Sequence, residues 1–474
     1  MKSDLHISAR THDRAGSLGE LLRVSVPLII SYSATALMHV VDRIFLSWYS
    51  VDAMAATLPA GVIHWNLASL AIGTVTYANA IVGQYVGAGD EKRVGPVLWQ
   101  GIYMSLVAAG LMLCLIPLAS ATFAAFDHHA DIQHLEVRYF TILAIGTGPL
   151  LVSSTLSCFY SGRGRTATVM VANIIATLFN VVLDYVLIFG KAGFPELGIE
   201  GAAIATSISF ASIALMYVIH MLWTERHSHY CLWSGWRFDR ELFARLFKYG
   251  FPSGVQQFLD IACWSIFIQL MGRLGKAELA ATGLVFNLNS LAFIPMMGLG
   301  TAVTALVGQR IGDARPQLAV RTTWLAFGVA MVYTLAFATV YLFVPHVILA
   351  PYGVAASQPE VASLVIQLLR LVALYSIFDA TAVVFSSAIR GAGDTRFAMY
   401  LSVTLGAFLL VLPTVYAVRH GSAGFLTSWY AVVAFLFALA VGFVLRFQQG
   451  RWKTMRVIEH TAADIELEPE AAVI

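Results

Sequence analysis

The sequence predicts an all-α polytopic membrane protein with twelve transmembrane helices in two parallel six-helix repeats. Composition is the first observation: of 474 residues, 58% are hydrophobic and 12% are charged, whereas soluble domains carry about 25% charged residues. The second observation is a series of apolar segments, each long enough to cross a bilayer, which takes about 20 residues. The third is an internal duplication of the chain.

The apolar segments number twelve, and polar stretches separate them. They lie near 24–47, 57–86, 97–119, 139–162, 167–189, 200–223, 246–272, 279–309, 319–344, 363–389, 397–418 and 424–446. The segments near 57–86 and 279–309 are long for a simple span, so we expect them to tilt or to protrude.

The longest polar interruption, residues 224–250, divides the chain almost in half. When the first half is shifted by 225 positions, Val82-Gly83-Gln84 aligns with Val307-Gly308-Gln309. With a shift of 229, Gly162 aligns with Gly391. We therefore predict a tandem duplication of a six-helix unit. Because six is even, both copies insert the same way up, as parallel repeats related by an axis along the membrane normal.

Five regions follow from this division, and the basic residues orient them. With both termini inside, most of the 29 lysines and arginines fall in cytoplasmic segments, as the positive-inside rule requires. The first 23 residues have no apolar h-region of a signal peptide, and a compact chain of this kind suits a bacterial inner membrane. The regions are a cytoplasmic segment 1–23, an N-terminal lobe 24–223, a cytoplasmic inter-lobe loop 224–245, a C-terminal lobe 246–447 and a cytoplasmic tail 448–474.

Three polar residues in the first half stand inside apolar spans. Asn180 and Asp184 are four positions apart and so share one helical face, and Asp42 lies at a similar depth, each acid being roughly 26 Å from the start of its helix at 1.5 Å per residue. An ionisable group at bilayer depth costs roughly 2.5–3.5 kcal/mol on insertion scales. Two carboxylates and an amide oxygen suit a hard cation, or a carboxyl pair that shares a proton. We predict an ion-coupling site here; the alternative is a structural polar group joining neighbouring helices.

The second half carries different polar residues. Asp260 and Asp379 lie near mid-span, and Tyr375 precedes Asp379 by one turn, whereas Leu409 and Pro413 stand opposite the Asn-Asp pair of the first half. We predict that Asp260 and Asp379 form a second site, either for an ion or as a counter-charge to the substrate.

Two neighbours of Asp42 admit two interpretations each. His39 lies one turn before it and is either a proton relay or a structural polar residue. Arg43 follows it directly and is expected to extend toward the outer headgroups; pairing with either acid would instead disfavour proton binding there.

Six motifs, in this order and spacing, resemble the multidrug and toxic compound extrusion (MATE) transporters over about 26–445. They are VPLIISYSATALMHVVDRIFLS around Asp42, VGQYVGAGDEKR at 82–93, NVVLDYVLIFGKAGFPELGIEGAAIAT at 180–206, LFKYGFPSGVQQFLD at 246–260, VGQRIGD at 307–313 and DATAVVFSSAIRGAGDTR at 379–396.

The resemblance implies a V-shaped two-lobe transporter that exports cationic or amphipathic small molecules while Na⁺ or H⁺ flows inward. It implies no cofactor beyond the coupling ion, and one chain with two lobes suffices as a monomer. In one branch of the family the seventh helix usually carries a Glu and an aromatic residue stands near the tenth-helix Asp; Asp260 and Tyr375 occupy those places. Polar and adaptable side chains that could line the cleft, or simply belong to the membrane core, are Gln256, Gln257, Phe293, Met296 and Met297.

Two other functional classes compete with a drug exporter. A flippase for a lipid-linked precursor would share a duplicated core, but it should add helices or a markedly basic cavity. A membrane-embedded enzyme should show a His/Asp or Ser/His constellation, and no buried acid has such a partner at motif spacing. We therefore expect transport without catalysis.

Overall fold

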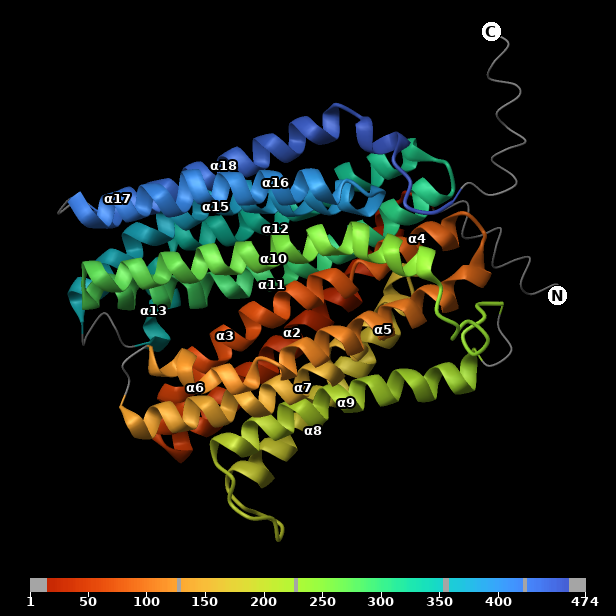
Figure 1. Ribbon diagram of the computed structural model, residues 1–474. Helices are drawn as coiled ribbons and strands as arrows, with labels where there is room; N and C mark the ends of the chain where they lie inside the picture. The colour runs from red at the N-terminus through yellow and green to blue at the C-terminus, as the bar shows by residue number, and fades with distance from the viewer. Residues whose placement is uncertain (1–14, 126–128, 226–228, 353–357, 421–423, 460–474) are drawn as a thin grey trace.

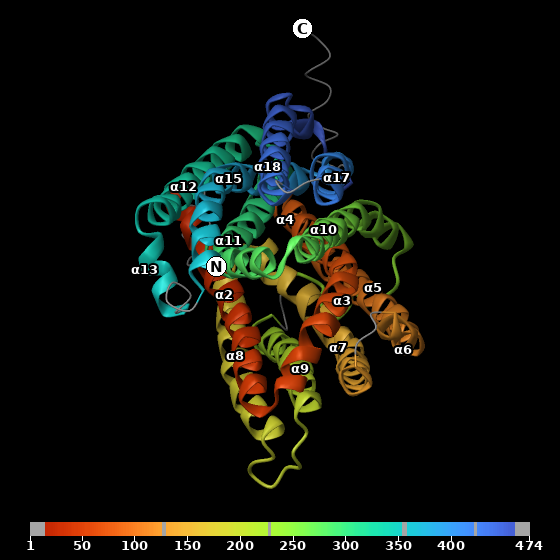
Figure 2. The same ribbon diagram turned by 90° about the vertical axis from the view of Figure 1, so that its left-hand side faces the viewer.

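The computed structural model describes residues 15–125, 129–225, 229–352, 358–420 and 424–459 (Figures 1 and 2). Residues 1–14 of the predicted N-terminal segment and 460–474 of the predicted tail lie outside the described residues. Throughout the described ranges the regular secondary structure is helical.

The first lobe is built around one long central helix, α7, which contacts α3, α4, α5, α6 and α9, while α2 packs on α8. Its elements are α2 (Leu18–Tyr49), α3 (Val51–Val75), α4 (Ala78–Gly87), η1 (Glu91–Arg93), α5 (Val94–Leu113), α6 (Ile116–Ala124), α7 (Ala130–Gly162), α8 (Thr166–Ile188) and α9 (Ile199–Thr224).

The second lobe has α15 in the corresponding central place, in contact with α11, α12 and α18. Its elements are α10 (Arg240–Leu274), α11 (Lys276–Gly312), α12 (Pro316–Phe343), α13 (Pro345–Leu349), η2 (Ala350–Tyr352), α15 (Pro359–Ala392), α16 (Thr395–Leu405), η3 (Gly406–Val411), α17 (Leu412–His420), α18 (Gly424–Gln448) and η4 (Arg451–Thr454).

Eleven helices among the described residues are long and apolar enough to cross a membrane. The remaining predicted span, 246–272, lies in α10, whose mean hydropathy is lowered by Gln256, Gln257 and Asp260. The predicted long segment 57–86 is divided into α3 and α4, whereas the segment 279–309 lies within the single helix α11. The prediction of an all-α, two-lobe membrane fold is confirmed.

Helix α8 shows how the sequence sets the lipid-facing surface. Val171, Ile175 and Val182 are exposed at helical spacing, while Asn180 and Asp184 lie on the buried side. Large exposed apolar surface of this kind marks contact with a membrane. The polar side of the helix therefore faces the interior of the lobe.

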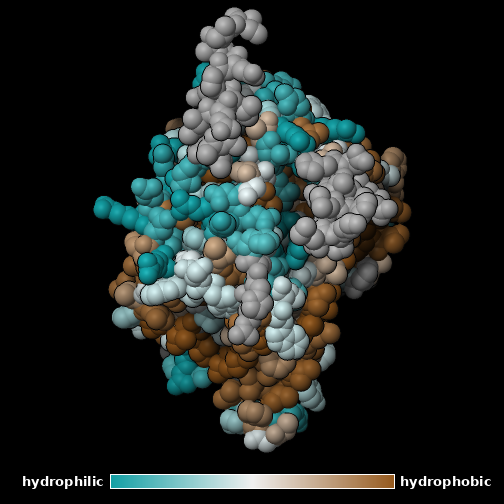
Figure 3. Space-filling view, turned by 90° about the vertical axis from the view of Figure 1, so that its right-hand side faces the viewer, coloured by the Kyte–Doolittle hydropathy of each residue, from teal (hydrophilic) through white to brown (hydrophobic). Residues whose placement is uncertain are grey.

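The lobes are held together at one end of the molecule, where α4, α7, α11 and α15 terminate; we call it the closed end. It lies on the right of Figure 1. Cross-lobe packing joins α2 and α4 to α11, and α3 to α10. Figure 3 looks onto this end: hydrophilic residues gather across it, and hydrophobic residues cover much of the flank below.

Glycines let the backbones of α4 and α11 touch at the closed end. A Cβ at Gly83 would lie 2.9 Å from the Ala305 carbonyl oxygen, and one at Gly87 would overlap the carbonyl of Gln309. The contact repeats with the lobes exchanged, because a Cβ at Gly312 would overlap the carbonyl of Gln84. The duplication seen in the sequence is therefore a two-fold-like interface in space.

A pair of glutamines completes this interface. Gln84 Nε2 donates to the carbonyl oxygens of Gly391 (3.0 Å) and Ala392 (3.3 Å) at the end of α15. Gln309 Nε2 donates to the Gly162 carbonyl oxygen (2.7 Å) at the end of α7. Each glutamine thus satisfies a terminal helix carbonyl of the opposite lobe, where no intrahelical donor exists.

The segment between the lobes follows the surface of α5. Gly95 N donates to the Tyr230 carbonyl (2.9 Å) and Trp99 Nε1 to that of Leu232 (2.7 Å). The predicted inter-lobe loop is therefore attached to the first lobe at Tyr230 and Leu232, whereas its last residues, 240–245, already belong to α10 of the second lobe.

The glycine contact yields a stability prediction. Gly312→Ala should lower the free energy of unfolding by about 1–3 kcal/mol, because an added methyl forces the two backbones apart. Gly328→Ala is the matched control, since nothing lies within 4 Å of a Cβ at that helical glycine; it should be neutral or stabilising by up to about 1 kcal/mol. Thermal unfolding in detergent measures both, and equal midpoints would contradict the prediction.

Candidate functional site

Two helices of the first lobe bring the predicted ion-coupling residues together. Asp42 comes from α2, and Asn180 and Asp184 come from α8. With its amide oriented to satisfy its neighbours, Asn180 Nδ2 donates to Asp42 Oδ1 and to Asp184 Oδ2, each at 3.1 Å. The exposed fractions are 4% for Asp42 and 0% for the other two. One amide therefore bridges two buried carboxyl groups.

A fourth residue, Thr206 on α9, was not predicted. Its Oγ1 donates to Asp42 Oδ2 at 3.2 Å. Hydroxyl residues are frequent in α9 and most bond their own helix, as Ser209 does to the Ala205 carbonyl. Only the position of Thr206 within a quoted motif could have signalled its role.

The charge of this cluster demands a counter-ion or a proton. Asp184 Oδ1 is buried and has no hydrogen-bond partner among the described residues. Two negative carboxylates around one amide, away from water, repel strongly. The two acids and the Thr206 hydroxyl supply oxygens that fit a cation such as Na⁺, and a proton shared by the acids would relieve the same repulsion. In this orientation Asn180 turns its amide nitrogen toward the acids, and not the oxygen that the sequence suggested as a ligand.

Neighbouring basic groups compensate the cluster only weakly. Arg43 is exposed. His39 Nδ1 lies 3.7 Å from Asp42 Oδ2, with the imidazole side chain 40% exposed and set edge-on to Trp65. A protonated His39 would add positive charge at the edge of the site, so this histidine stays a candidate relay.

The second-lobe acids are arranged differently. Asp260 on α10 interacts electrostatically with Asp379 on α15 and with Arg390. Tyr375 is 2% exposed, and its hydroxyl has no hydrogen-bond partner in the described part of the chain. Among the described residues no amide or hydroxyl bridges these two acids, so this group is looser than the first-lobe cluster. Its predicted role stays a prediction.

The predicted cleft residues occupy several environments. Gln256 is buried and its Nε2 donates to Ser402 Oγ (3.0 Å) within the second lobe. Gln257 lies at the lobe interface, where its Oε1 would meet a Cβ at Gly73. Their role as a lining remains a prediction. Of the other predicted lining residues, Phe293 is half-buried, Met296 is buried and Met297 is exposed.

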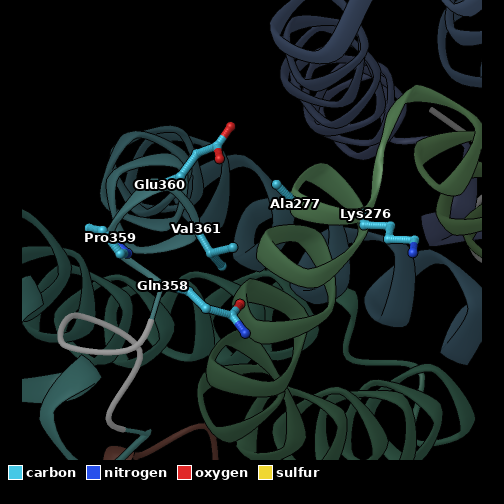
Figure 4. A pocket seen from close by; sticks show the side chains of 6 residues that line it. All are labelled: Lys276, Ala277, Gln358, Pro359, Glu360 and Val361. Atoms are coloured by element: carbon cyan, nitrogen blue, oxygen red, sulfur yellow. The ribbon is translucent and has the colours of Figure 1, made fainter.

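One pocket of about 380 Å³ lies apart from all these residues, at the ends of α11 and α15 farthest from the closed end (Figure 4). Lys276 and Glu360 are among the residues that line it, and it contains none of the predicted site residues.

Two similar helical lobes, one of which encloses a buried acidic cluster, are typical of one class of protein, the polytopic transporters with two lobes. The model of the MatE family matches residues 27–186 and 252–417, one stretch in each repeat. The chain therefore belongs to the MatE family, as its motifs indicated.

Curated relatives match over nearly their whole length. "Multidrug resistance protein MdtK" of Pectobacterium atrosepticum is 29% identical over 449 residues, covering 90% of this chain and 94% of its own. "Multidrug resistance protein PmpM" of Pseudomonas aeruginosa is 28% identical, covering 87% and 85%. "Probable multidrug resistance protein NorM" of Thermotoga maritima is 23% identical, covering 93% and 94%.

Solved structures share the fold. A structure of a multidrug resistance MATE family transporter in the outward-facing conformation superposes with a TM-score of 0.83 at 20% identity, covering 92% of this chain and 96% of the other. A MOP superfamily transporter from Pyrococcus furiosus gives the same values.

The bridging amide yields a second prediction. Asn180→Leu should destabilise the protein by about 1–3 kcal/mol, because both carboxyl groups lose their shared donor while buried. The double variant Asn180→Leu/Asp184→Leu should be less destabilised than the sum of the two single variants, because only one acid then needs compensation. Unfolding midpoints of the wild type, the two single variants and the double variant at pH 8 test this. If the effects of the two single substitutions simply add in the double variant, the amide does not bridge the acids.

Proposed function

We propose that this protein is a secondary active multidrug exporter that moves cationic or amphipathic small molecules out of the cell by antiport with Na⁺ or H⁺. The observation that carries the proposal is the first-lobe cluster of Asp42, Asn180, Asp184 and Thr206 inside a duplicated two-lobe fold. Relatives named multidrug resistance proteins support the substrate class. Transport of this kind needs no covalent chemistry.

Occupancy of the cluster by a cation or proton would alter the packing of α2, α8 and α9. When the cluster holds no cation or proton, the two carboxylates repel each other. When it holds one, they can approach their shared ligand. The population of inward- and outward-open states shifts only if the ion binds the two states with different affinity. Because the cluster is made from three helices, their relative movement is what would change that affinity.

Helix α2 offers a physical link from the ion site to the lobe interface. It carries Asp42 and, about 15 Å along the same helix, Tyr32, whose hydroxyl lies 3.0 Å from Thr301 Oγ1 of the other lobe. At Ile29 the backbone of α2 lies 2.7 Å from where a Cβ on Gly298 would stand. A shift of α2 at the ion site would therefore disturb its contacts with α11.

We assign the closed end to the cytoplasm, so that the present conformation faces outward. Basic residues support this orientation. Near the closed end lie Lys92, Arg93, Arg163, Arg165, Arg245, Lys248, Arg310 and Arg315.

Efflux of a fluorescent cation such as ethidium from proteoliposomes tests the proposal. A Na⁺ gradient and a proton gradient are imposed separately on wild type, Asp184→Asn and Asp379→Asn. We expect Asp184→Asn to lose gradient-driven efflux by about tenfold or more. Asp131→Asn, an exposed acid at the start of α7, is the matched control and should retain it.

The other outcomes are informative. Loss only in Asp379→Asn would move the coupling site to the second lobe. A wild-type protein that moves no cation under either gradient would contradict the exporter proposal, and flipping of a labelled lipid-linked precursor would then be assayed on the same vesicles.

A further inference from the structure

A short segment after the last span crosses the closed end and touches both lobes. Residues 451–459, which we call the C-terminal strap, begin with η4. Trp452 is fully buried, stacks on Phe447 at 4.8 Å and donates from Nε1 to the Phe447 carbonyl (2.8 Å). Val457 and Ile458 are also buried. The strap is therefore anchored to the second lobe at its start.

Its far half reaches the first lobe. Val457 N donates to Gln84 Oε1 at 2.8 Å, so the glutamine that donates to the end of α15 also accepts from the strap. Tyr85 Oη donates to Glu459 Oε2 at 2.7 Å. From the second lobe, Arg245 Nη1 lies 2.7 Å from Glu459 Oε1. Glu459 thus joins α4 of one lobe to α10 of the other.

The internal repeat explains why an acid is needed there. At a shift of 225, Glu20 corresponds to Arg245 and Tyr85 corresponds to Arg310. Arg310 and Glu20 form a direct ion pair across the lobes. At the equivalent place on the other side, Arg245 donates to the Tyr85 hydroxyl (3.1 Å), a neutral group. The acid that Glu20 supplies on one side is supplied on the other by Glu459.

The charge state of Glu459 agrees with this arrangement. Partial burial would raise its pKa, but the hydrogen bonds from Tyr85 and Arg245 outweigh burial and hold the pKa below the ordinary value. The carboxylate is therefore ionised at neutral pH, and both of its oxygens have partners from different lobes.

We propose that the C-terminal strap holds the closed end shut, and that its detachment from α4 is a required step in opening that end. Separating α4 from α10 and α11 breaks the Val457–Gln84 and Glu459–Tyr85 hydrogen bonds together. The strap thereby sets the balance between the two states of the alternating-access cycle, and to that extent the inference rests on the proposed function.

Two truncations separate the strap from the rest of the tail. One ends the chain after Gly450 and removes the strap; the matched control ends it after Glu459 and keeps the strap. Spin labels are placed at Lys92 and Gln317, exposed residues near the closed end of the first and second lobes, in a background whose four cysteines are replaced. The distance distribution between the labels reports closure directly, without any substrate.

We expect one short distance in the full chain and in the control truncation. Truncation after Gly450 should raise the ratio of long to short distances by about tenfold, and Glu459→Leu by about two- to fivefold, because hydrogen bonds to a charged group are lost. Glu360→Leu, at an exposed acid in the first turn of α15 and so at the end farthest from the closed end, should leave the ratio unchanged.

Identical distributions for the truncation after Gly450 and its control would overturn the proposal. If the shorter chain does not fold, Glu459→Leu decides alone, since an unchanged distribution in that variant also overturns it. If the wild-type protein moves no cation but the spin-label distances of the strap variants still lengthen, the result counts against the proposed transport and not against the role of the strap.

Discussion

The backbones of α4 and α11 meet at glycines, and the arrangement of the two lobes follows from how closely they approach. Gly87 and Gly312 leave no room for a Cβ, which lets Gln84 and Gln309 reach terminal carbonyls of the opposite lobe. Burial of these carbonyls without donors would be costly. The closed end is thus held by close backbone contacts, and these allow the side-chain hydrogen bonds to form. If the lobes separate as rigid bodies, the backbone contacts and the hydrogen bonds must break nearly together.

The ion cluster lies away from this interface, and α2 belongs to both. Asp42 is held by the Asn180 amide and the Thr206 hydroxyl, whereas residues nearer the start of α2 pack on α11. A long helix that is polar at one depth and closely packed at another can convert local electrostatic change into movement at a distance. The second lobe differs at the counterpart of the Asn180–Asp184 pair: a π-helical turn, 406–411, precedes Pro413. Proline has no N–H to donate to the Leu409 carbonyl, as a regular α-helix would require.

The parts of the fold and of the site that could be predicted were those with a clear pattern in the sequence. Hydropathy and the repeat gave the helices and the two lobes, and buried charge identified Asp42 and Asp184. The Gln84/Gln309 correspondence was visible as duplication, but an aligned pattern does not say which helix a residue touches, so the cross-lobe bonds were not foreseen. Thr206 resembled the other hydroxyls of α9. Glu459 lay in a region expected to be only a polar tail, and nothing in its neighbourhood suggested a tertiary contact.

The unequal residues at equivalent positions of the two repeats, Glu20 and Arg245, bear on the ancestry of the chain. Two separate, identical six-helix subunits would have carried the same residue at the places now held by Glu20 and Arg245. The two sides of their dimer would therefore have been identical in charge. Fusion into one chain freed each copy to mutate alone. The extension past the last span could then contribute an acid to one side only. The unequal pairing of Arg310 with Glu20 and of Arg245 with Glu459 is thus an arrangement that a symmetric homodimer cannot contain.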